Sequence, residues 1–209
     1  MNCTSQPVAG QVVYTVGHSN QPAEEFLDLL RQHEIEVVVD VRSSPFSRFV
    51  PQFNKRELQA TVREAGFQYV YLGRELGGRP DPGSDLIDDE GHAIYGLIAE
   101  TNAFNDGLRR LLEGIGRYRV ALMCSEEDPT DCHRRLLVAR VLILDHGIDV
   151  RHIRGDGRID TEDDLTRMPY DAPIQQSLFG STDDDARKRA WRSIRSVLPR
   201  NLRDSSSTS

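Results

Sequence analysis

The sequence predicts an α/β protein with a Rossmann-like, open and mostly parallel sheet of about five strands and helices on both faces. Three observations lead to this fold class. Short apolar runs alternate along the chain with longer amphipathic segments, in the order βαβαβαβαβ. The run from Ile35 to Val41 is rich in β-branched residues and too short for a helix of usual length, which is typical of a strand covered on both faces. Polar residues follow four of the expected strands, at the edge where parallel sheets bind ligands.

Local signals bound each element. The expected strands cover residues 12–16, 35–41, 68–72, 119–123 and 149–153, and the expected helices cover residues 22–33, 54–65, 104–115 and 131–146. Pro22 suits a first helical turn, Asn54 can cap the second helix, and Gly66 and Gly147 can end helices. Residues 73–94 form a long loop rich in Gly, Pro and Asp, and loops of this length in a compact domain are often functional.

Composition and charge limit the classes of function. The chain has 209 residues, a formal charge of −7 and three cysteines, and it lacks the ~20 consecutive apolar residues of a membrane helix. We therefore expect a cytoplasmic protein with reduced thiols and no membrane partner. We expect a flexible N-terminus at 1–10, one α/β domain at 11–153 and a mostly disordered polar tail at 154–209.

The segment 41–80 is locally basic within an acidic chain. It holds seven basic and three acidic side chains, an arrangement that suits a confined anionic ligand better than a long polyanion. Aromatic and amide residues accompany these charges: Phe46, Phe49, Phe53, Tyr69, Tyr71, Gln52 and Asn54. Aromatic rings with arginines between them can stack exposed bases. The alternative is that they are core aromatics beside solvated arginines.

The segment from Met123 to Arg135 holds the candidate catalytic residues Cys124, Glu126, Cys132 and His133. Thr130 or Asp131 is expected to cap the following helix, whose first turn lowers the pKa of a thiol. Both cysteines could instead be small buried hydrophobic residues. Acidic residues in the loop and Thr at position 130 argue against a thiol phosphatase or sulfurtransferase cradle. We predict no metal or other cofactor, because the usual zinc spacing is missing; a nonstandard zinc site that recruits His18 stays open.

Other candidate residues follow the ends of the expected strands. His18 could act as a general acid or base, and the expected anion- or nucleotide-binding set is Ser19, Asp40, Arg42, Ser44, Arg48, Arg74, Gly77, Gly78 and Arg134. Each has a structural alternative: a hydrogen-bonding turn histidine, an ion pair between Asp40 and Arg42, and glycines that only turn the chain. Their shared edge of the sheet is the reason to group them.

An apolar pair stands out in the polar tail. The segment Ile174-Gln175-Gln176-Ser177-Leu178-Phe179-Gly180 resembles the bacterial sliding-clamp-binding peptide, with Gln175, Leu178 and Phe179 as the binding residues. Alternatively, Leu178 and Phe179 could pack the tail onto its own domain. The resemblance implies a sliding clamp as partner through residues 175–179.

The chain also resembles a family. Residues 12–153 are similar to the domain of unknown function 488, through the motifs Thr15-Val-Gly-His18-Ser-Asn20, Asp40-Val-Arg42 with Ser44-Pro45, Gln52-Phe-Asn54, Leu76-Gly-Gly78 and Met123-Cys124-x-Glu126 followed by Cys132-His-Arg134. The resemblance implies a Rossmann-like α/β domain with suspected functional cysteines. It implies no particular reaction.

Three hypotheses for function follow. The first is a DNA-maintenance enzyme, hydrolase or glycosylase-like, that acts on an altered nucleotide or base and is recruited by a clamp-binding tail. In it, Cys124 or Cys132 is a nucleophile or redox sensor. The second is a thiol-dependent enzyme for a small anionic metabolite, and the third a non-catalytic nucleotide-binding adaptor.

Overall fold

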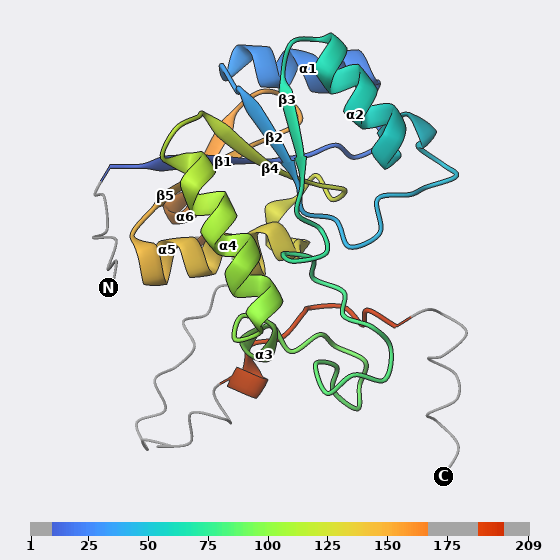
Figure 1. Ribbon diagram of the computed structural model, residues 1–209, viewed down its shortest axis with the longest axis vertical. Helices are drawn as coiled ribbons and strands as arrows, with labels where there is room; N and C mark the ends of the chain where they lie inside the picture. Colours follow the sequence, from blue (N-terminus) through green and yellow to red (C-terminus); the bar gives the residue numbers. More distant parts are fainter. Residues whose placement is uncertain (1–9, 167–187, 199–209) are drawn as a thin grey trace.

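A computed structural model describes residues 10–166 and 188–198 and contains one six-stranded sheet (Figure 1). The strands are β1 (Val12–Gly17), β2 (Val37–Asp40), β3 (Gln68–Tyr71), β4 (Val120–Cys124), β5 (Asp149–Ile153) and β6 (Ile159–Thr161). Their order is β3-β2-β4-β1-β5-β6, and all neighbours are parallel except β5 and β6. The mostly parallel α/β fold is confirmed, with six strands instead of about five.

Helices lie on both faces of the sheet. They are α1 (Ala23–Gln32), α2 (Lys55–Glu64), α3 (Tyr95–Ile98), α4 (Asn102–Ile115), α5 (Arg140–His146) and α6 (Glu162–Thr166), with a π-helical segment, Arg134–Ala139, leading directly into α5. Single 3₁₀ turns occur at Pro51–Phe53 and Pro129–Asp131. Figure 1 shows α4 crossing the sheet on the side opposite α1 and α2.

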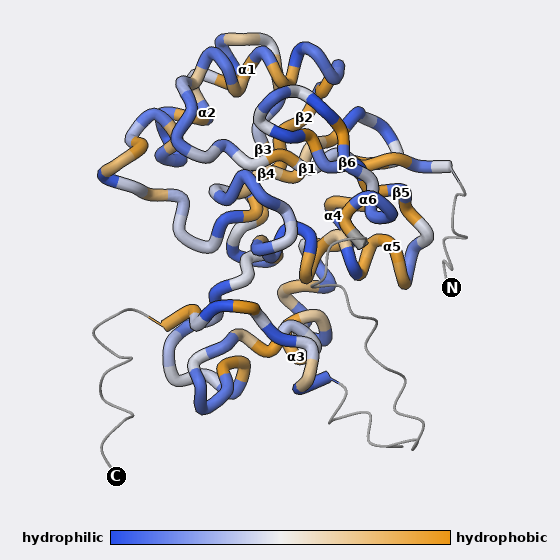
Figure 2. The backbone as a smooth tube through the Cα atoms, turned by 180° about the vertical axis from the view of Figure 1, so that it is seen from behind, coloured by the Kyte–Doolittle hydropathy of each residue, from blue (hydrophilic) through white to orange (hydrophobic). Residues whose placement is uncertain are grey.

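Side-chain alternation along the strands builds one core on each face. In β2, Val37 and Val39 belong to the cluster that contains Leu108 and Leu111 of α4. Val38 points the other way, into the cluster with Phe26 of α1. Both faces of the strand are therefore buried, as its apolar sequence predicts. Figure 2 shows hydrophobic central strands and mixed hydropathy along α1 and α2, whose outer faces meet solvent.

The structure continues the domain past the expected boundary at residue 153. The antiparallel strand β6 and helix α6 follow β5, and buried His152 connects them to the core. Thr15 Oγ1 donates to His152 Nδ1 at 2.8 Å, and His152 Nε2 donates to Glu162 at 2.8 Å. Burial lowers the pKa of His152, which favours this neutral form. Hydrogen bonds, and not a periodic pattern of apolar residues, connect this segment to the domain. The hydrophobic pattern of the sequence therefore did not predict it.

Part of the expected tail also packs on the domain. Residues 188–198 run beside residues 88–96, where the Ser193 amide donates to Ala93 and the Val197 amide donates to Gly91 (Figure 1). Trp191 Nε1 donates to the Leu136 carbonyl at 2.7 Å. The clamp-like peptide 175–179 lies outside the described residues.

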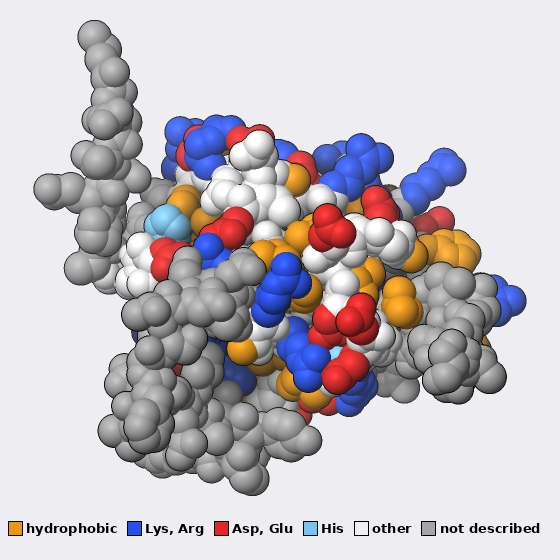
Figure 3. Space-filling view, turned by 90° about the horizontal axis from the view of Figure 1, so that it is seen from below, with side chains coloured by type: hydrophobic (Ala, Val, Ile, Leu, Met, Phe, Trp, Pro, Cys, Tyr) orange, Lys and Arg blue, Asp and Glu red, His pale blue; other side chains and the backbone are white. Residues whose placement is uncertain are grey.

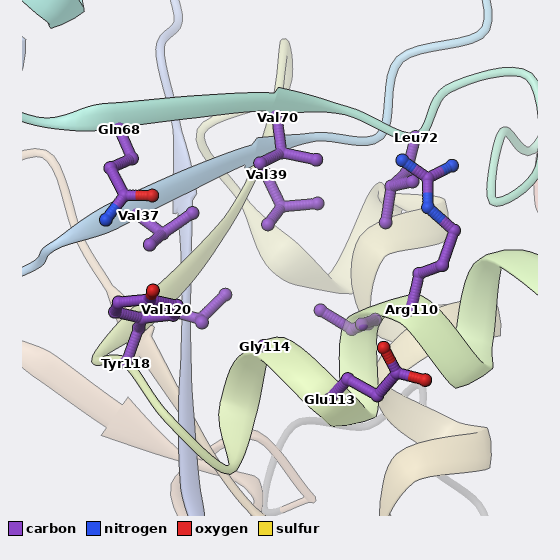
Figure 4. Close-up of a pocket in the computed structure, with 11 residues that line it drawn as sticks. Val37, Val39, Gln68, Val70, Leu72, Arg110, Glu113, Gly114, Tyr118 and Val120 are labelled. Carbon is purple, nitrogen blue, oxygen red and sulfur yellow. The ribbon is translucent and has the colours of Figure 1, made fainter.

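An apolar groove lies between α4 and the β2–β3 part of the sheet, with a volume of about 230 Å³. Val37, Val39 and Val70 form its floor, and Arg110 and Glu113 of α4 lie at its border (Figure 4). It lies along the sheet face and includes none of the candidate catalytic residues.

None of the helices in the described ranges is long and apolar enough to cross a membrane.

Candidate functional site

Two thiols, a carboxylate and an imidazole meet at the carboxyl end of β4. Glu126 Oε2 lies 3.0 Å from Cys124 Sγ and 3.3 Å from Cys132 Sγ. His133 Nδ1 lies 3.6 Å from Cys124 Sγ. Cys124 and Cys132 are 3% and 1% exposed, while Glu126 and His133 are partly buried. The structure thus brings together four of the five predicted catalytic residues, and we call these four the thiol cluster.

The chain path between β4 and α5 builds the thiol cluster. Cys124 is the last residue of β4, and the 3₁₀ turn Pro129–Asp131 brings the chain back. Asp128 caps that turn by accepting from the Thr130 amide at 2.9 Å. Cys132 then has extended φ and ψ angles, and its sulfur accepts from the Arg134 amide at 3.5 Å. Cys132 therefore occupies the capping position that the sequence assigned to Thr130 or Asp131.

The orientation of His133 is set by its backbone partner. Its Nε2 lies 2.9 Å from the Val41 carbonyl, which can only accept, so Nε2 carries the hydrogen. Nδ1 consequently presents a lone pair toward Cys124 in the neutral ring. A Cβ on Gly78 would lie 2.5 Å from His133 Cβ, so a glycine is needed for this loop to pack against the imidazole. Gly78 serves the site by positioning His133, whereas the sequence assigned it to anion binding.

Electrostatics differ between the two thiols. Burial raises the pKa of Cys124 well above its usual value, and the neighbouring Cys132 and Glu126 raise it further. Burial also opposes ionisation of Cys132, but its hydrogen bond with Cys124 and the charge of Arg134 lower its pKa to about 5. The thiol hydrogen bonds lower the pKa of Glu126 to about 2 in spite of burial. An ionised Cys132 cannot also donate to Glu126, so in that state two negative groups touch without a proton between them.

His18 does not join the thiol cluster. Its Nδ1 donates to the Ser19 carbonyl at 2.7 Å, so Nε2 accepts from Arg42 at 3.0 Å. Burial and the Arg42 charge lower the pKa of His18 to about 4. The ring stacks on Phe53, with centroids 4.2 Å apart. Because both ring nitrogens have protein partners, His18 provides neither a free base nor the zinc ligand that the sequence left open.

Arg42 and Asp40 belong to the same buried network. Arg42 donates through Nε and one terminal nitrogen to Asp40, and through the other to the Phe53 carbonyl. The Tyr69 hydroxyl also donates to Asp40, at 2.7 Å. The guanidinium is 5% exposed, so the ion pair that the sequence offered as the structural alternative matches the geometry.

Arg134 is fully buried and holds the loop after β4. Its guanidinium donates to the Glu126 carbonyl, to the Glu127 carbonyl at 2.6 Å and to Thr15 Oγ1 at 3.3 Å. These acceptors replace the anion predicted for this side chain. Arg134 therefore positions the backbone that carries Glu126.

The remaining predicted anion-binding residues lie at the same edge with different exposure. Ser44, Arg48 and Arg74 are exposed, and Ser19 is partly buried with a left-handed φ of 49°. A Cβ on Gly77 would lie 2.3 Å from Ser43 Oγ, so this glycine permits loop packing.

The aromatic residues of the basic segment divide into two groups. Phe53 and Tyr69 are buried in the core, as the structural alternative proposed. Phe46 and Phe49, in the loop after β2, are 70% and 89% exposed and flank Arg48. We call residues 46–49 the aromatic loop.

On the face seen in Figure 3, basic, acidic and hydrophobic side chains are intermixed among the described residues.

Tyr95 is a site residue that the sequence analysis missed. It is buried at the start of α3, and burial together with the nearby Cys132, Cys124 and Glu126 raises its pKa. The Gly96 amide donates to the Trp191 carbonyl, so residues 188–198 help to hold this segment. No local pattern could identify Tyr95, because a helix of four residues has no periodicity.

These features define an α/β protein with a thiol, imidazole and carboxylate cluster at the carboxyl edge of its sheet. Residues 22–141 match the model of the family described as "Domain of unknown function DUF488", and the chain belongs to that family. The match includes the motifs at Asp40, Gly77 and Cys124, while the motif from Thr15 to Asn20 precedes it. No curated protein and no solved structure matches the chain.

Gly17→Ala tests how tightly the loop after β4 packs on β1. A Cβ at position 17 would lie 1.8 Å from the Glu126 carbonyl oxygen, so the backbone must move. We expect the free energy of unfolding to fall by about 1–3 kcal/mol or more. Gly114→Ala in α4 is the control: its Cβ meets only Val120 at 4.0 Å, and helix propensity predicts a gain of up to about 1 kcal/mol. Urea unfolding measures both, and equal stability of the two variants would contradict this packing.

Proposed function

We propose that this protein is a hydrolytic enzyme of DNA maintenance that acts on an altered nucleotide or base. The observation that carries the proposal is the position of Glu126, held against two buried thiols directly beyond β4. A carboxylate in such a site can take a proton from an attacking water and return it to the leaving group. His133 Nδ1 lies 3.6 Å from Cys124 Sγ, and Tyr95 packs in the same buried cluster as the two cysteines.

Two exposed aromatic side chains in the aromatic loop support a nucleotide as substrate. The aromatic loop follows β2, the neighbour of β4 in the sheet, and His133 Nε2 bonds to Val41 at the end of β2. Exposed rings beside arginine stack bases of any sequence, at about 1–3 kcal/mol per base. A small anionic metabolite offers no ring to stack, so exposed Phe46 and Phe49 favour the nucleotide.

The two described cysteines are free, which supports action in the cytoplasm, where thiols stay reduced. We further propose that Gln175, Leu178 and Phe179 bind a sliding clamp and thereby deliver an acidic protein to DNA. The support for clamp binding is the similarity of residues 174–180 to the sliding-clamp-binding peptide.

Glu126→Gln tests the proposed chemistry. We expect turnover of altered nucleosides, nucleotides or base-containing oligonucleotides to fall at least about 100-fold, because the amide cannot accept the proton. Chromatography with mass spectrometry of the products measures this. Glu127→Gln is the matched control, since its carboxylate accepts from Arg154 at 2.9 Å and forms no hydrogen bond with either of the two described cysteines. Equal turnover by Glu126→Gln and the wild type would remove the general base from the proposal.

The aromatic loop is tested by binding. We expect Phe46→Ala and Phe49→Ala each to weaken binding of a fluorescent single-stranded oligonucleotide about tenfold, because each removes one stacking ring. Leu144→Ala, which shortens another exposed hydrophobic side chain, should bind as the wild type does. Fluorescence anisotropy at fixed salt compares the three variants. Unchanged affinity in both phenylalanine variants would place the substrate elsewhere.

The clamp-binding peptide is tested with the full chain. We expect purified sliding clamp to be captured by the wild-type protein and lost with the double variant Leu178→Ala, Phe179→Ala. The variant should keep its enzymatic activity, because the peptide lies apart from the thiol cluster in sequence. Capture by both proteins would refute recruitment through residues 175–179.

A further inference from the structure

We propose that Cys124, Cys132 and His133 bind one zinc ion. The three donor atoms, two Sγ and the His133 Nδ1, all lie within 4.8 Å of one another at the end of β4. The spacing of these residues along the chain, seven residues between the cysteines and then an adjacent histidine, is not a usual zinc motif. Folding brings the donors together because the 3₁₀ turn Pro129–Asp131 reverses the chain between them.

The distance between Cys124 Sγ and His133 Nδ1 matches a tetrahedral site. Zinc lies about 2.3 Å from a thiolate sulfur and about 2.0–2.1 Å from an imidazole nitrogen, which separates the two donors by about 3.6 Å at a tetrahedral angle. Cys124 Sγ and His133 Nδ1 are 3.6 Å apart. An ion can therefore enter between them with little change in these side chains.

The imidazole is already in the tautomer that a ligand needs. His133 donates Nε2–H to the Val41 carbonyl, as metal-binding histidines commonly do to a backbone carbonyl, and this leaves Nδ1 free. Gly78 packs against the His133 Cβ and limits ring movement. Two contacts outside the donor set thus orient His133 toward the thiols.

Among the described residues, no lysine or arginine forms an ion pair with Glu126 of the thiol cluster. Two thiols and the Glu126 carboxylate touch one another in a buried place. Two buried guanidinium groups at this edge have partners of their own, since Arg42 is paired with Asp40 and Arg134 donates to the carbonyls of Glu126 and Glu127. A divalent ion would supply the missing positive charge. Sulfur and imidazole donors select zinc over magnesium or calcium, which prefer oxygen.

Three protein ligands leave a fourth position for water, the pattern of catalytic rather than structural zinc sites. The Glu126 carboxylate touches both thiols but is outside the group of mutually close donors, so it can serve that water as a base. This role rests on the proposed function. Glu126 takes a proton from the water while the water oxygen bonds to the substrate carbon. Glu126 then returns the proton to the departing group. Nucleobase deaminases use such a donor set with a non-ligand glutamate.

Metal analysis of the full-length protein tests the site. We expect elemental analysis to find about one zinc per chain after purification or after loading with zinc and dialysis. Cobalt loaded in its place should show thiolate-to-cobalt charge-transfer absorption, a signature that needs no substitution. Cys124→Ser, Cys132→Ser and His133→Asn should each lower retained zinc about tenfold or more.

Matched controls separate ligands from other residues of the same type. His146→Asn should retain zinc as the wild type does, since His146 is not in the donor group found among the described residues. We expect the same of Cys3→Ser, at a position outside the described residues. A wild-type protein that takes up neither zinc nor cobalt would overturn the proposal, as would ligand variants that retain the metal. Zinc binding without hydrolysis of any nucleotide would leave the site standing and remove the proposed function. Hydrolysis by the metal-free protein would leave the proposed function standing and remove zinc from its mechanism.

Discussion

The site depends on one buried cation, the guanidinium of Arg134. Among the residues that the structure describes, no carboxylate pairs with it, and two backbone carbonyls and the hydroxyl of Thr15 accept its hydrogen bonds. A buried charge that loses its partners costs several kcal/mol, so the loop carrying Glu126 cannot move away without that penalty. Arg134 also lies in the first turn of the helix that follows Cys132, and its backbone amide donates to the Cys132 sulfur. A single residue therefore fixes both sides of the thiol cluster.

A second buried network holds the neighbouring strand. Asp40, Arg42, His18 and Tyr69 form one buried hydrogen-bonded network. Val41, between Asp40 and Arg42 in the chain, provides the carbonyl on which His133 depends. The edge thus divides into an ion-pair network beyond β2 and the thiol cluster beyond β4. That division explains why charged residues with similar sequence signals have different roles.

The sequence patterns predicted the helices and strands better than they predicted which side chains bond to one another. The β-branched run of β2 and the amphipathic pattern of α4 identify buried faces, because hydrophobic burial acts on each residue separately. The strand β6 was missed because the polar contacts of His152 and Glu162 hold it. In the same way Arg134 looked like an anion-binding residue, since nothing in the chain order shows that the Glu127 carbonyl lies against it.

The sequence by itself determined the α/β class, the family and the identity of the four residues in the thiol cluster. The hydrophobic periodicity and the residues that follow each strand can be read from short stretches of sequence. Because the carboxyl ends of parallel strands share one edge of the sheet, these residues are expected there together. Only the tertiary structure decided that His133 lies beside Cys124 while His18 does not, that Tyr95 packs in the same buried cluster as the cysteines, and that two arginines are already occupied. These outcomes depend on which acceptors lie within about 3 Å in space, a competition among groups that are distant in the chain.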